Sequence, residues 1–451
     1  AVSGRVIGGA LELAMACHFR VCDKETRFST PEVNLGINPG AGGSQRLPRL
    51  TGVEEALSML LTAKQIKADE ALAMGLVDAV SDPDQLMDLA LETLKSGSEP
   101  VRTGGRTDKI EDRAANASAI HTARERLAKV RPELIAPAGI IKALETGLQE
   151  SFEAGLLMEQ EVFAECMAAP AARNKMYVFF ATRDTGKISG LSSVKPNSIA
   201  QAAVIGMGSM GTGIAHALII GGTPVIVRDE DQSVLDKGVG RITRSIEKRV
   251  ESGKMTRARA DEMLSLLTTT TDWQGIADAV LVIEAVFEET KVKHAVIKQI
   301  EATCSDDTIV ASNTSTISLD ALAEGMQNPE RLIGMHFFNP AQTMPLVEII
   351  RHDATPDDII MTALKFARTI RKTPVLVGNR EGFIVNRMFI PYLKEAFRLL
   401  EDGASPTAID QAMIDFGMAM GPLTLIDMAG IDILVFVDEV MSQAFPTHGK
   451  L

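Results

Sequence analysis

The chain has 451 residues, of which 45% are hydrophobic and 23% are charged, so it is expected to form about three soluble globular domains. Its formal net charge of −13 argues against nucleic acid or an anionic membrane as the main partner. No apolar run reaches the roughly 18 residues that a membrane span needs. The four cysteines lack zinc-site spacing, so we expect small buried thiols and no metal.

The first candidate site lies near the N-terminus, where a small-residue turn at residues 6–15 leads into a helical pattern. Glu12 stands there among apolar neighbours, and a buried acid is costly unless it has a partner or a function. A second carboxylate, Glu32, follows in a loop rich in Gly and Pro. From spacing alone, a catalytic pair and two ordinary glutamates, one capping a helix and one on the surface, fit equally well.

The amino-acid sequence of the surrounding segments favours the catalytic interpretation. Over roughly the first 95 residues the chain resembles the enoyl-CoA hydratase (crotonase) family, and three motifs match in order. These motifs are GGALELAMAC, TPEVNLGINPGAGGSQRLPRL and LTAKQIKADEALAMGLVDAV.

The resemblance implies that Glu12 and Glu32 are the two catalytic carboxylates that add water across the double bond of a trans-2-enoyl-CoA. This chemistry needs a general acid and a general base, because water is activated at C3 while C2 is protonated. The thioester oxygen gains negative charge, and Gly9 matches one of the family's two N–H donors to it. The other donor would precede Ala1, and because the chain starts without methionine, we expect a fragment cut at that end.

Residues 96–195 are expected to form a helical region that ends in a linker. Apolar residues recur at helical intervals over residues 136–167, and Gly, Ser and Pro concentrate over residues 187–198. His121 and Tyr177 have no partners at catalytic spacing, so we interpret both as structural.

The next unit opens with a strand, a glycine turn and a helix start at residues 202–215. Gly206, Gly208 and Gly211 have the G-x-G-x-x-G spacing that permits a tight turn, close approach of a pyrophosphate and packing of helix on strand. The helix start offers N–H groups to the phosphates. A second apolar run ends at Asp229, close to where an acidic residue binds the ribose hydroxyls, so the unit is predicted to bind a dinucleotide.

Polar residues follow the later strands of this unit. A strand at the start of residues 309–317 leads to Ser315, and His336 follows the next apolar run. Glu348 stands at the end of a further apolar run that would bring it back beside the sheet. An imidazole beside a carboxylate can accept a proton near pH 7, as the oxidation of an alcohol by hydride transfer requires.

From about residue 199 onwards the chain resembles the L-3-hydroxyacyl-CoA dehydrogenase family through five motifs in order, VIGMGSMGTGIA, ASNTSTI, GMHFFNP, LVEII and GFIVNR. The resemblance implies NAD as the cofactor and His336 as the base that takes the 3-hydroxyl proton. Glu348 would orient and charge the imidazole, and Ser315 and Asn386 would contact the substrate. Asn339 would lie near both cofactor and substrate.

The same resemblance implies a set of cofactor-contacting positions around the glycine turn and the neighbouring strand ends. Asp229 is expected to repel the 2′-phosphate of NADP, although Arg228 beside it is a residue type that can accommodate one. The positions are Gly206, Gly208, Met210, Gly211, Asp229, Val286, Phe287, Glu288, Lys293, Ser315 and Asn339.

After Gly382 the chain is expected to be helical, which in the dehydrogenase family completes the substrate cleft and much of the subunit contact. About 70 residues follow, so we expect this part to be cut short as well. The predicted α/β architecture has four parts. These are a partial crotonase spiral (1–95), a helical region with linker (96–195), a Rossmann NAD-binding domain (196–381) and a truncated all-α domain (382–451).

The order of the two halves resembles the bifunctional fatty-acid beta-oxidation proteins, either the alpha subunit of the bacterial complex or the peroxisomal enzyme. The resemblance implies acyl-CoA thioester substrates and a cytoplasmic location in a bacterium or a peroxisomal one in a eukaryote. It leaves open a thiolase partner, a homo-oligomer and an enoyl-CoA isomerase activity.

Two alternatives remain, a stand-alone dehydrogenase with an inactive hydratase remnant and a non-catalytic, crystallin-like NAD-binding protein. Retention of Glu12 and Glu32 argues against the first alternative, and retention of His336 and Glu348 argues against the second.

Overall fold

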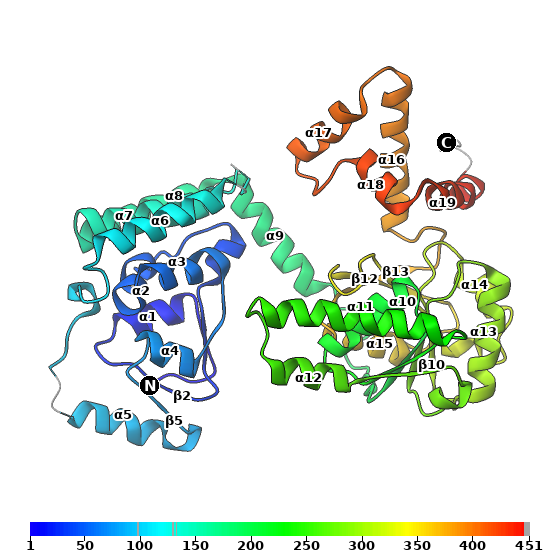
Figure 1. Cartoon of the computed structure of the whole chain (residues 1–451), viewed down its shortest axis with the longest axis horizontal. Helices are drawn as coiled ribbons and strands as arrows, with labels where there is room; N and C mark the ends of the chain where they lie inside the picture. The colour runs from blue at the N-terminus through cyan, green and yellow to red at the C-terminus, as the bar shows by residue number, and fades with distance from the viewer. Residues whose placement is uncertain (97–98, 129, 132, 446–451) are drawn as a thin grey trace. The chain divides into compact units, whose positions relative to one another are not determined.

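A computed structural model describes residues 1–96, 99–128, 130–131 and 133–445 of the chain. It divides into two compact units, Ala1–Thr182 and Arg183–Leu451, and each is considered by itself (Figure 1). The end of the predicted C-terminal domain, residues 446–451, lies outside the described residues. Among those residues, no helix combines the length and the apolarity needed to cross a bilayer.

The N-terminal unit joins two small sheets to a set of helices. One sheet has the strand order β1-β3-β4 and the other pairs β2 with β5. The strands are β1 (Arg5–Ile7), β2 (Val21–Asp23), β3 (Arg27–Ser29), β4 (Ile66–Lys67) and β5 (Ala79–Ser81). The α-helices are α1 (Gly9–Ala16), α2 (Gly43–Thr51), α3 (Val53–Thr62), α4 (Ala68–Met74), α5 (Leu86–Lys95), α6 (Arg113–Leu127), α7 (Ile135–Gln149), α8 (Phe152–Ala168) and α9 (Pro170–Asp184). The 3-10 helices are η1 (Pro31–Leu35), η2 (Pro83–Gln85) and η3 (Thr103–Gly105).

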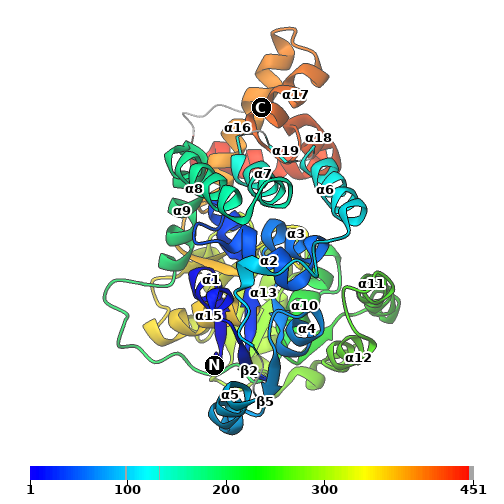
Figure 2. The same ribbon diagram turned by 90° about the vertical axis from the view of Figure 1, so that its left-hand side faces the viewer.

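The core of this unit extends beyond the segment that resembles the hydratase family. Leu11 and Leu47 share one apolar cluster with Ile120 of α6 and with Ile140 and Leu144 of α7. Figure 2 shows α6, α7 and α8 lying over α2 and α3. Most of residues 96–195, predicted to be a helical region that ends in a linker, is therefore part of a packed domain, and the extended linker is confined to the residues after α9.

The second unit is built on an eight-stranded sheet with the order β13-β12-β11-β10-β9-β6-β7-β8. All neighbouring strands are parallel except β11 and β12. The strands are β6 (Ala202–Ile205), β7 (Val225–Arg228), β8 (Leu267–Thr270), β9 (Leu281–Glu284), β10 (Ile309–Ser312), β11 (Leu332–Phe337), β12 (Leu346–Arg351) and β13 (Thr373–Gly378). β6, β9 and β10 are buried throughout, as expected for central parallel strands covered on both faces.

Helices cover both faces of this sheet, which confirms the predicted doubly wound arrangement (Figure 1). One face is packed by α10 (Ser209–Ile220), α11 (Gln232–Glu251), α12 (Arg257–Ser265) and α15 (Asp357–Thr369). The other face is packed by α13 (Thr290–Thr303), α14 (Leu319–Ala323) and the 3-10 helix η4 (Trp273–Ile276), and η5 (Pro329–Arg331) precedes β11. The strand order changes direction around β6, so the glycine turn after β6 lies at the switch point where this fold binds ligands.

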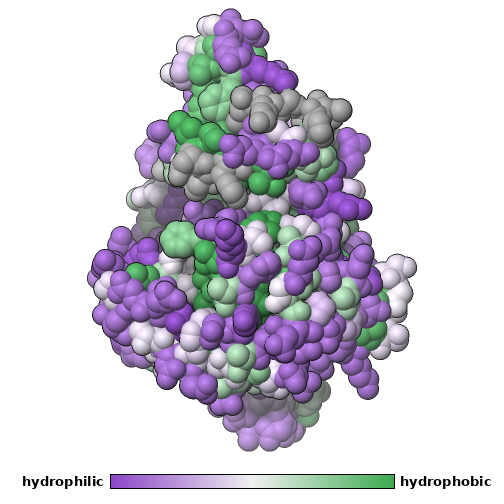
Figure 3. Space-filling view, turned by 90° about the vertical axis from the view of Figure 1, so that its right-hand side faces the viewer, coloured by the Kyte–Doolittle hydropathy of each residue, from purple (hydrophilic) through white to green (hydrophobic). Residues whose placement is uncertain are grey.

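The last part of the described chain is helical, as predicted. It consists of α16 (Val385–Glu401), α17 (Pro406–Phe416), α18 (Pro422–Ala429) and α19 (Ile431–Ala444). Met388, Phe416 and Met428 are exposed here. Hydrophobic atoms are visible at the surface in the upper part of Figure 3.

The expectation of small buried thiols is wrong for one cysteine. Cys22, Cys166 and Cys304 are buried, but Cys17 is exposed. Cys17 follows the last residue of α1 as its C-cap, where the chain leaves the helix at the surface.

Candidate active sites

The glycine turn after β6 has a shape that excludes side chains at two of its three glycines. Gly206 has φ +96°, and a Cβ added there would lie 2.9 Å from the carbonyl oxygen of Ala285. A Cβ on Gly211 would lie 1.7 Å from the carbonyl oxygen of Gly206. Nothing lies within 4 Å of the Cβ position of Gly208, the N-cap of α10, so the helix start is open to a phosphate. The turn therefore fits a dinucleotide.

Asp229 lies directly after β7, beside the glycine turn. Its Oδ2 accepts a hydrogen bond from the backbone N–H of Met207 at 2.7 Å. The Arg228 guanidinium carbon lies 4.1 Å from the centre of the Trp273 indole ring, and its side chain is largely buried. Asp229 is thus fixed to the turn, whereas Arg228 is held by a cation–π contact.

Arg241 of α11 also binds the glycine turn, and the sequence analysis missed it. Its Nη2 donates to the Met207 carbonyl oxygen at 3.1 Å and to Thr212 Oγ1 at 2.8 Å. Asp229 thus accepts from the backbone N–H of Met207, and Arg241 donates to its carbonyl oxygen, so both polar groups of this peptide residue are bound by neighbouring elements. An isolated Arg in a charged helix gives no pattern that reveals this contact.

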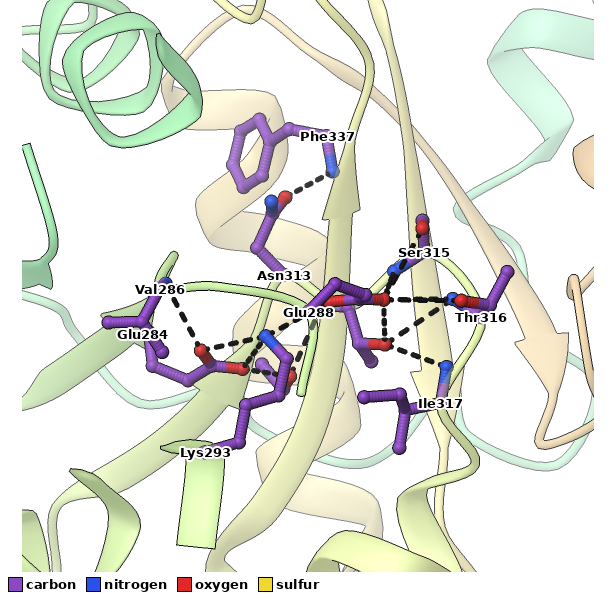
Figure 4. A network of polar contacts seen from close by, with 11 residues as sticks. Glu284, Val286, Glu288, Lys293, Asn313, Ser315, Thr316, Ile317 and Phe337 are labelled. Carbon is purple, nitrogen blue, oxygen red and sulfur yellow. Dashed lines mark hydrogen bonds and ion pairs between the residues drawn. The ribbon is translucent and has the colours of Figure 1, made fainter. Parts of the chain in front are cut away.

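A buried ionic network follows β9 (Figure 4). Lys293 on α13 is 1% exposed, and its Nζ lies 2.9 Å from both oxygens of Glu284 and 3.2 Å from Glu288 Oε2. Burial alone would lower the pKa of Lys293, but the two carboxylates outweigh burial and raise it. The ammonium therefore stays charged, and in this structure it contacts the two glutamates.

Glu288 joins this network to the turn that carries Ser315 (Figure 4). Its Oε1 accepts hydrogen bonds from Thr314 Oγ1 at 2.6 Å and from the Ser315 N–H at 2.7 Å. Burial would raise the pKa of Glu288, but Lys293 and these donors hold it below its usual value. Val286 is half-buried, and Phe287 is 85% exposed. Direct contact of these predicted positions with a cofactor stays a prediction.

His336 and Glu348 face each other across β11 and β12, where the antiparallel register pairs them directly. The His336 Nδ1 lies 2.8 Å from Glu348 Oε2, and both side chains are buried. A carboxylate at Nδ1 favours the tautomer with a proton there, which leaves the lone pair of Nε2 to accept another.

The second oxygen of Glu348 fixes the start of the helical segment. Glu348 Oε1 accepts hydrogen bonds from the N–H groups of Ile384 and Val385, both at 3.0 Å. The preceding residues, Gly382 and Phe383, have φ +68° and +48°. Both oxygens of Glu348 thus have defined partners, which fixes the direction in which it holds His336.

Asn386 follows on the same helix and reaches the serine turn. Its Nδ2 donates to the Ser315 carbonyl oxygen at 3.1 Å. The structure therefore brings together Ser315, His336, Glu348 and Asn386. Asn313, which the sequence analysis did not single out, accepts the Phe337 N–H at 2.9 Å (Figure 4).

Asn339 is exposed and borders a pocket of about 160 Å³ beside α10 and α11. Ser209, Arg241 and Ser245 line the same pocket, which places Asn339 near the glycine turn. Met210, one residue after Ser209 on α10, is half-buried and packs against the core. In the described part of the chain, no group of three or more His, Cys, Asp or Glu residues could hold a metal ion.

The second candidate site is in the N-terminal unit. Glu12 on α1 is 5% exposed, and its Oε1 accepts hydrogen bonds from the N–H groups of Ala41 and Gly43, both at 2.8 Å. Glu32 lies in η1, and a Cβ added to Gly8 would lie 2.8 Å from its Oε1. Gly9 is exposed and is the first residue of α1, where an N–H has no acceptor within the helix.

Glu32 has the environment of a titrating acid. Its Oε2 is buried without a hydrogen-bond partner among the described residues. Burial raises its pKa to about 7, and the charges of Glu12 and Glu159 add to the shift. The structure thus brings together both predicted carboxylates and adds a third, Glu159, which lies on α8 in the region predicted to be helical and was not singled out from the sequence.

Comparison with known proteins agrees with this geometry. Residues 201–380 match the NAD binding domain of 3-hydroxyacyl-CoA dehydrogenase, and residues 382–450 match the C-terminal domain of that enzyme. The solved (S)-3-hydroxybutyryl-CoA dehydrogenase from Ralstonia eutropha is 36% identical with a TM-score of 0.54, and the match covers 56% of this chain and 91% of that one. The chain belongs to the 3-hydroxyacyl-CoA dehydrogenase family. The dehydrogenase resemblance and the Rossmann NAD-binding domain are confirmed.

This member of the dehydrogenase family also carries a second family segment, because residues 1–106 match enoyl-CoA hydratase/isomerase. It is 39% identical to the glyoxysomal fatty acid beta-oxidation multifunctional protein of Cucumis sativus, over 99% of this chain and 62% of that protein. It is 38% identical to the fatty acid oxidation complex subunit alpha of Shewanella amazonensis, over 98% of this chain and 64% of that protein. The predicted combination of hydratase and dehydrogenase segments is confirmed, and the chain spans less than two thirds of these relatives.

Proposed function

We propose that the protein hydrates trans-2-enoyl-CoA to (S)-3-hydroxyacyl-CoA and oxidises that product with NAD to 3-ketoacyl-CoA. The observation that carries the proposal is the buried His336–Glu348 pair beside the serine turn, at the dinucleotide-binding edge of the sheet. The carboxylate cluster around Glu12 and Glu32 supports the hydration step.

In the proposed oxidation, His336 Nε2 takes the proton of the 3-hydroxyl group, and Glu348 stabilises the imidazolium that forms. Ser315 and Asn386 position the substrate, because the Asn386 amide is already bound to the Ser315 backbone. A bound NAD would supply the acceptor for the hydride that leaves C3.

The residues proposed to hold the dinucleotide are those whose geometry fits it. Gly206 and Gly211 permit the tight turn, Gly208 leaves the helix start open to the phosphates, and Asp229 would bind the ribose hydroxyls. The ion pairs of Lys293 keep Glu288 in place at the edge of the site, and Asn339 lies across the nearby pocket. Met210, Val286 and Phe287 are retained as proposed contacts.

In the proposed hydration, Glu12 and Glu32 act as the general base and general acid pair. Two amide donors hold Glu12, whereas one oxygen of Glu32 has no partner in the part of the chain that the structure describes. The pKa of Glu32 is about 7, so it can exchange a proton near neutral pH. The Gly9 N–H would bind the thioester oxygen as negative charge develops.

The cellular location and the partners of the protein are part of the proposal. Relatives named as glyoxysomal or peroxisomal proteins and as subunits of a bacterial complex match the chain to similar extents. We therefore propose a peroxisomal location if the source is a eukaryote and a cytoplasmic one if it is a bacterium. A thiolase partner and a homo-oligomer remain part of the proposal, as do the four domain boundaries given above.

Two assays on the full-length protein test the function. It should reduce acetoacetyl-CoA with NADH, and it should hydrate crotonyl-CoA. Reduction without hydration would favour the alternative of an inactive hydratase remnant, and neither activity in a folded protein that binds NADH would favour a non-catalytic role.

A further inference from the structure

The N-terminal unit contains a carboxylate that the proposed reaction does not use. Glu159 on α8 is 0% exposed, and no part of it faces solvent. Its carboxylate accepts hydrogen bonds from the N–H groups of Gly42 and Ser44 and from Ser44 Oγ. A buried carboxylate is costly unless donors of this kind surround it, so this site is built around an acidic residue.

Glu159 shares the start of α2 with Glu12. The N–H groups of Ala41 and Gly43 point to Glu12, and those of Gly42 and Ser44 point to Glu159. Four successive backbone donors therefore alternate between two carboxylates at the positive end of one helix. Neither carboxylate can shift without moving the backbone that binds the other.

The packing of α8 on α2 makes this arrangement possible. A Cβ on Gly155 would lie 2.1 Å from Gln45 Oε1, so α8 approaches α2 as closely as a glycine allows. Glu159 is one turn further along α8, on the same side as Gly155, and therefore reaches the start of α2. The Gln45 Nε2 donates to the Ala143 carbonyl oxygen at 2.7 Å, which fixes α7 to the same helix.

We infer that Glu159 is a positioning residue of the hydratase site, which holds the start of α2 so that Glu12 keeps its two amide donors. The inference rests on the proposed hydratase function. The predicted members of the hydratase site all lie within the first 95 residues. The inference adds a residue from a helix that lies later in the chain.

The carboxylate cluster also predicts that loss of the Glu159 charge changes the pKa of Glu32. The ionisable groups that act on Glu32 are Glu12 on α1 and Glu159 on α8. Arg46 of α2 donates to the Ala41 carbonyl oxygen, and the Lys175 side chain of α9 lies beside Gly36. Burial raises the pKa of Glu159 itself to about 7. Removing its charge should therefore lower the pKa of Glu32.

The decisive variant is Glu159→Gln in the full-length protein, because glutamine has a similar shape but carries no charge and places an NH2 donor where one of the two carboxylate oxygens accepted hydrogen bonds. The kcat for crotonyl-CoA hydration should fall roughly ten- to a hundred-fold, as expected for misplaced catalytic groups. The limb of the pH–rate profile that belongs to Glu32 should move to lower pH. Acetoacetyl-CoA reduction should not change.

The matched control is Glu161→Gln, since Glu161 is on the same helix but exposed. Glu159→Asp retains the charge, so the pH–rate limb should return towards its original position although kcat stays low. If Glu159→Gln kept the original kcat and pH–rate profile, or if Glu161→Gln lost as much activity, the inference would be wrong.

Hydrogen exchange separates the inference from the proposed function. Residues 39–46 should exchange faster in Glu159→Gln than in the original protein or in Glu161→Gln, whether or not the protein hydrates enoyl-CoA. Faster exchange in a protein without hydratase activity would reject the function but keep the positioning role, and unchanged exchange would reject the role. If Glu159→Gln does not fold, Ser44→Ala removes one donor and should lower kcat several-fold, and an unchanged kcat would contradict the inference.

Discussion

In the dehydrogenase site, His336 and Glu348 are direct partners on adjacent strands, so a single strand register places both. In the hydratase site, Glu12, Glu32 and Glu159 come from three elements that only tertiary packing brings together. A site set by register depends on its own sheet, whereas a site set by packing depends on distant helices. We therefore expect substitutions in distant helices to affect the hydratase site more than the dehydrogenase site. A substitution within one site should leave the activity of the other unchanged.

The largest expected effect separates the two activities. In the full-length protein, His336→Ala should lower dehydrogenase kcat/KM roughly a hundred- to ten-thousand-fold, the usual contribution of a positioned base, and leave hydration intact. His121→Ala is the control, because the His121 side chain is 74% exposed. Loss of both activities in a folded protein would show that the sites are not independent.

Glu12→Gln and Glu32→Gln should reverse this pattern. Crotonyl-CoA hydration should fall by a similar factor, because each variant removes one group of a general acid and base pair, and acetoacetyl-CoA reduction should stay unchanged. Glu25→Gln, at an exposed position of the same segment, should retain both activities. Full hydratase activity in either active-site variant would remove that residue from the proposed mechanism.

Lys293→Met tests how far the dehydrogenase site depends on its buried network. It leaves Glu284 and Glu288 without their counter-ion, which for a buried pair typically costs about 3–5 kcal/mol of folding free energy. Denaturant unfolding of the C-terminal unit and the KM for NADH should both report the change. The exposed Lys291→Met is the control, and an unaltered unfolding midpoint in Lys293→Met would mean that the network contributes little.

A smaller effect is expected in cofactor choice. Because Asp229 is fixed at the ribose position and Arg228 is held against Trp273, the protein should prefer NADH to NADPH by about tenfold in kcat/KM, or about 1.4 kcal/mol. Trp273→Ala should narrow the preference by releasing Arg228. Equal use of both cofactors by the original protein would contradict the role given to Asp229.

The smallest effect concerns stability and pH in the N-terminal unit. The folded pKa of Glu32 is about 7, above the ordinary value of 4.5, so the folded state binds more protons than the unfolded state between these values. Stability should therefore be greatest below about pH 4.5 as far as this group is concerned, and it should fall as pH rises through 7. Thermal unfolding of Glu32→Gln should show a weaker decline over this range, and an identical decline would argue against the shifted pKa.

The sequence predicted the dehydrogenase site better than the hydratase site for a physical reason. The glycine spacing, Asp229 and the His336–Glu348 pair follow from local strand and turn patterns, which are visible in the sequence. The partners of Glu12 are not visible in this way, because backbone N–H groups leave no mark in the sequence. Glu159 was missed because a single acid in an amphipathic helix is indistinguishable from a solvated one.

The same limit applies to the network around Lys293. Its position was identified as a cofactor contact through resemblance, whereas in the structure its ammonium is enclosed by Glu284 and Glu288. Burial of a lysine between two acids depends on how α13 packs against β9 and β10, and no sequence spacing encodes that packing. The packing of α6 and α7 into the hydratase core was unpredictable for the same reason.

The bonds from Glu348 to the start of α16 determine where the dehydrogenase could be divided. A natural cut between its two parts would fall near Gly382, where the chain leaves the sheet and the family match changes. The N–H groups of Ile384 and Val385, which belong to the second part by that division, are donors to the carboxylate that supports His336. A Rossmann domain isolated at residue 381 would keep its dinucleotide turn, but Glu348 would lose the two N–H donors that hold one of its oxygens. A functional truncation therefore has to retain the first turn of α16.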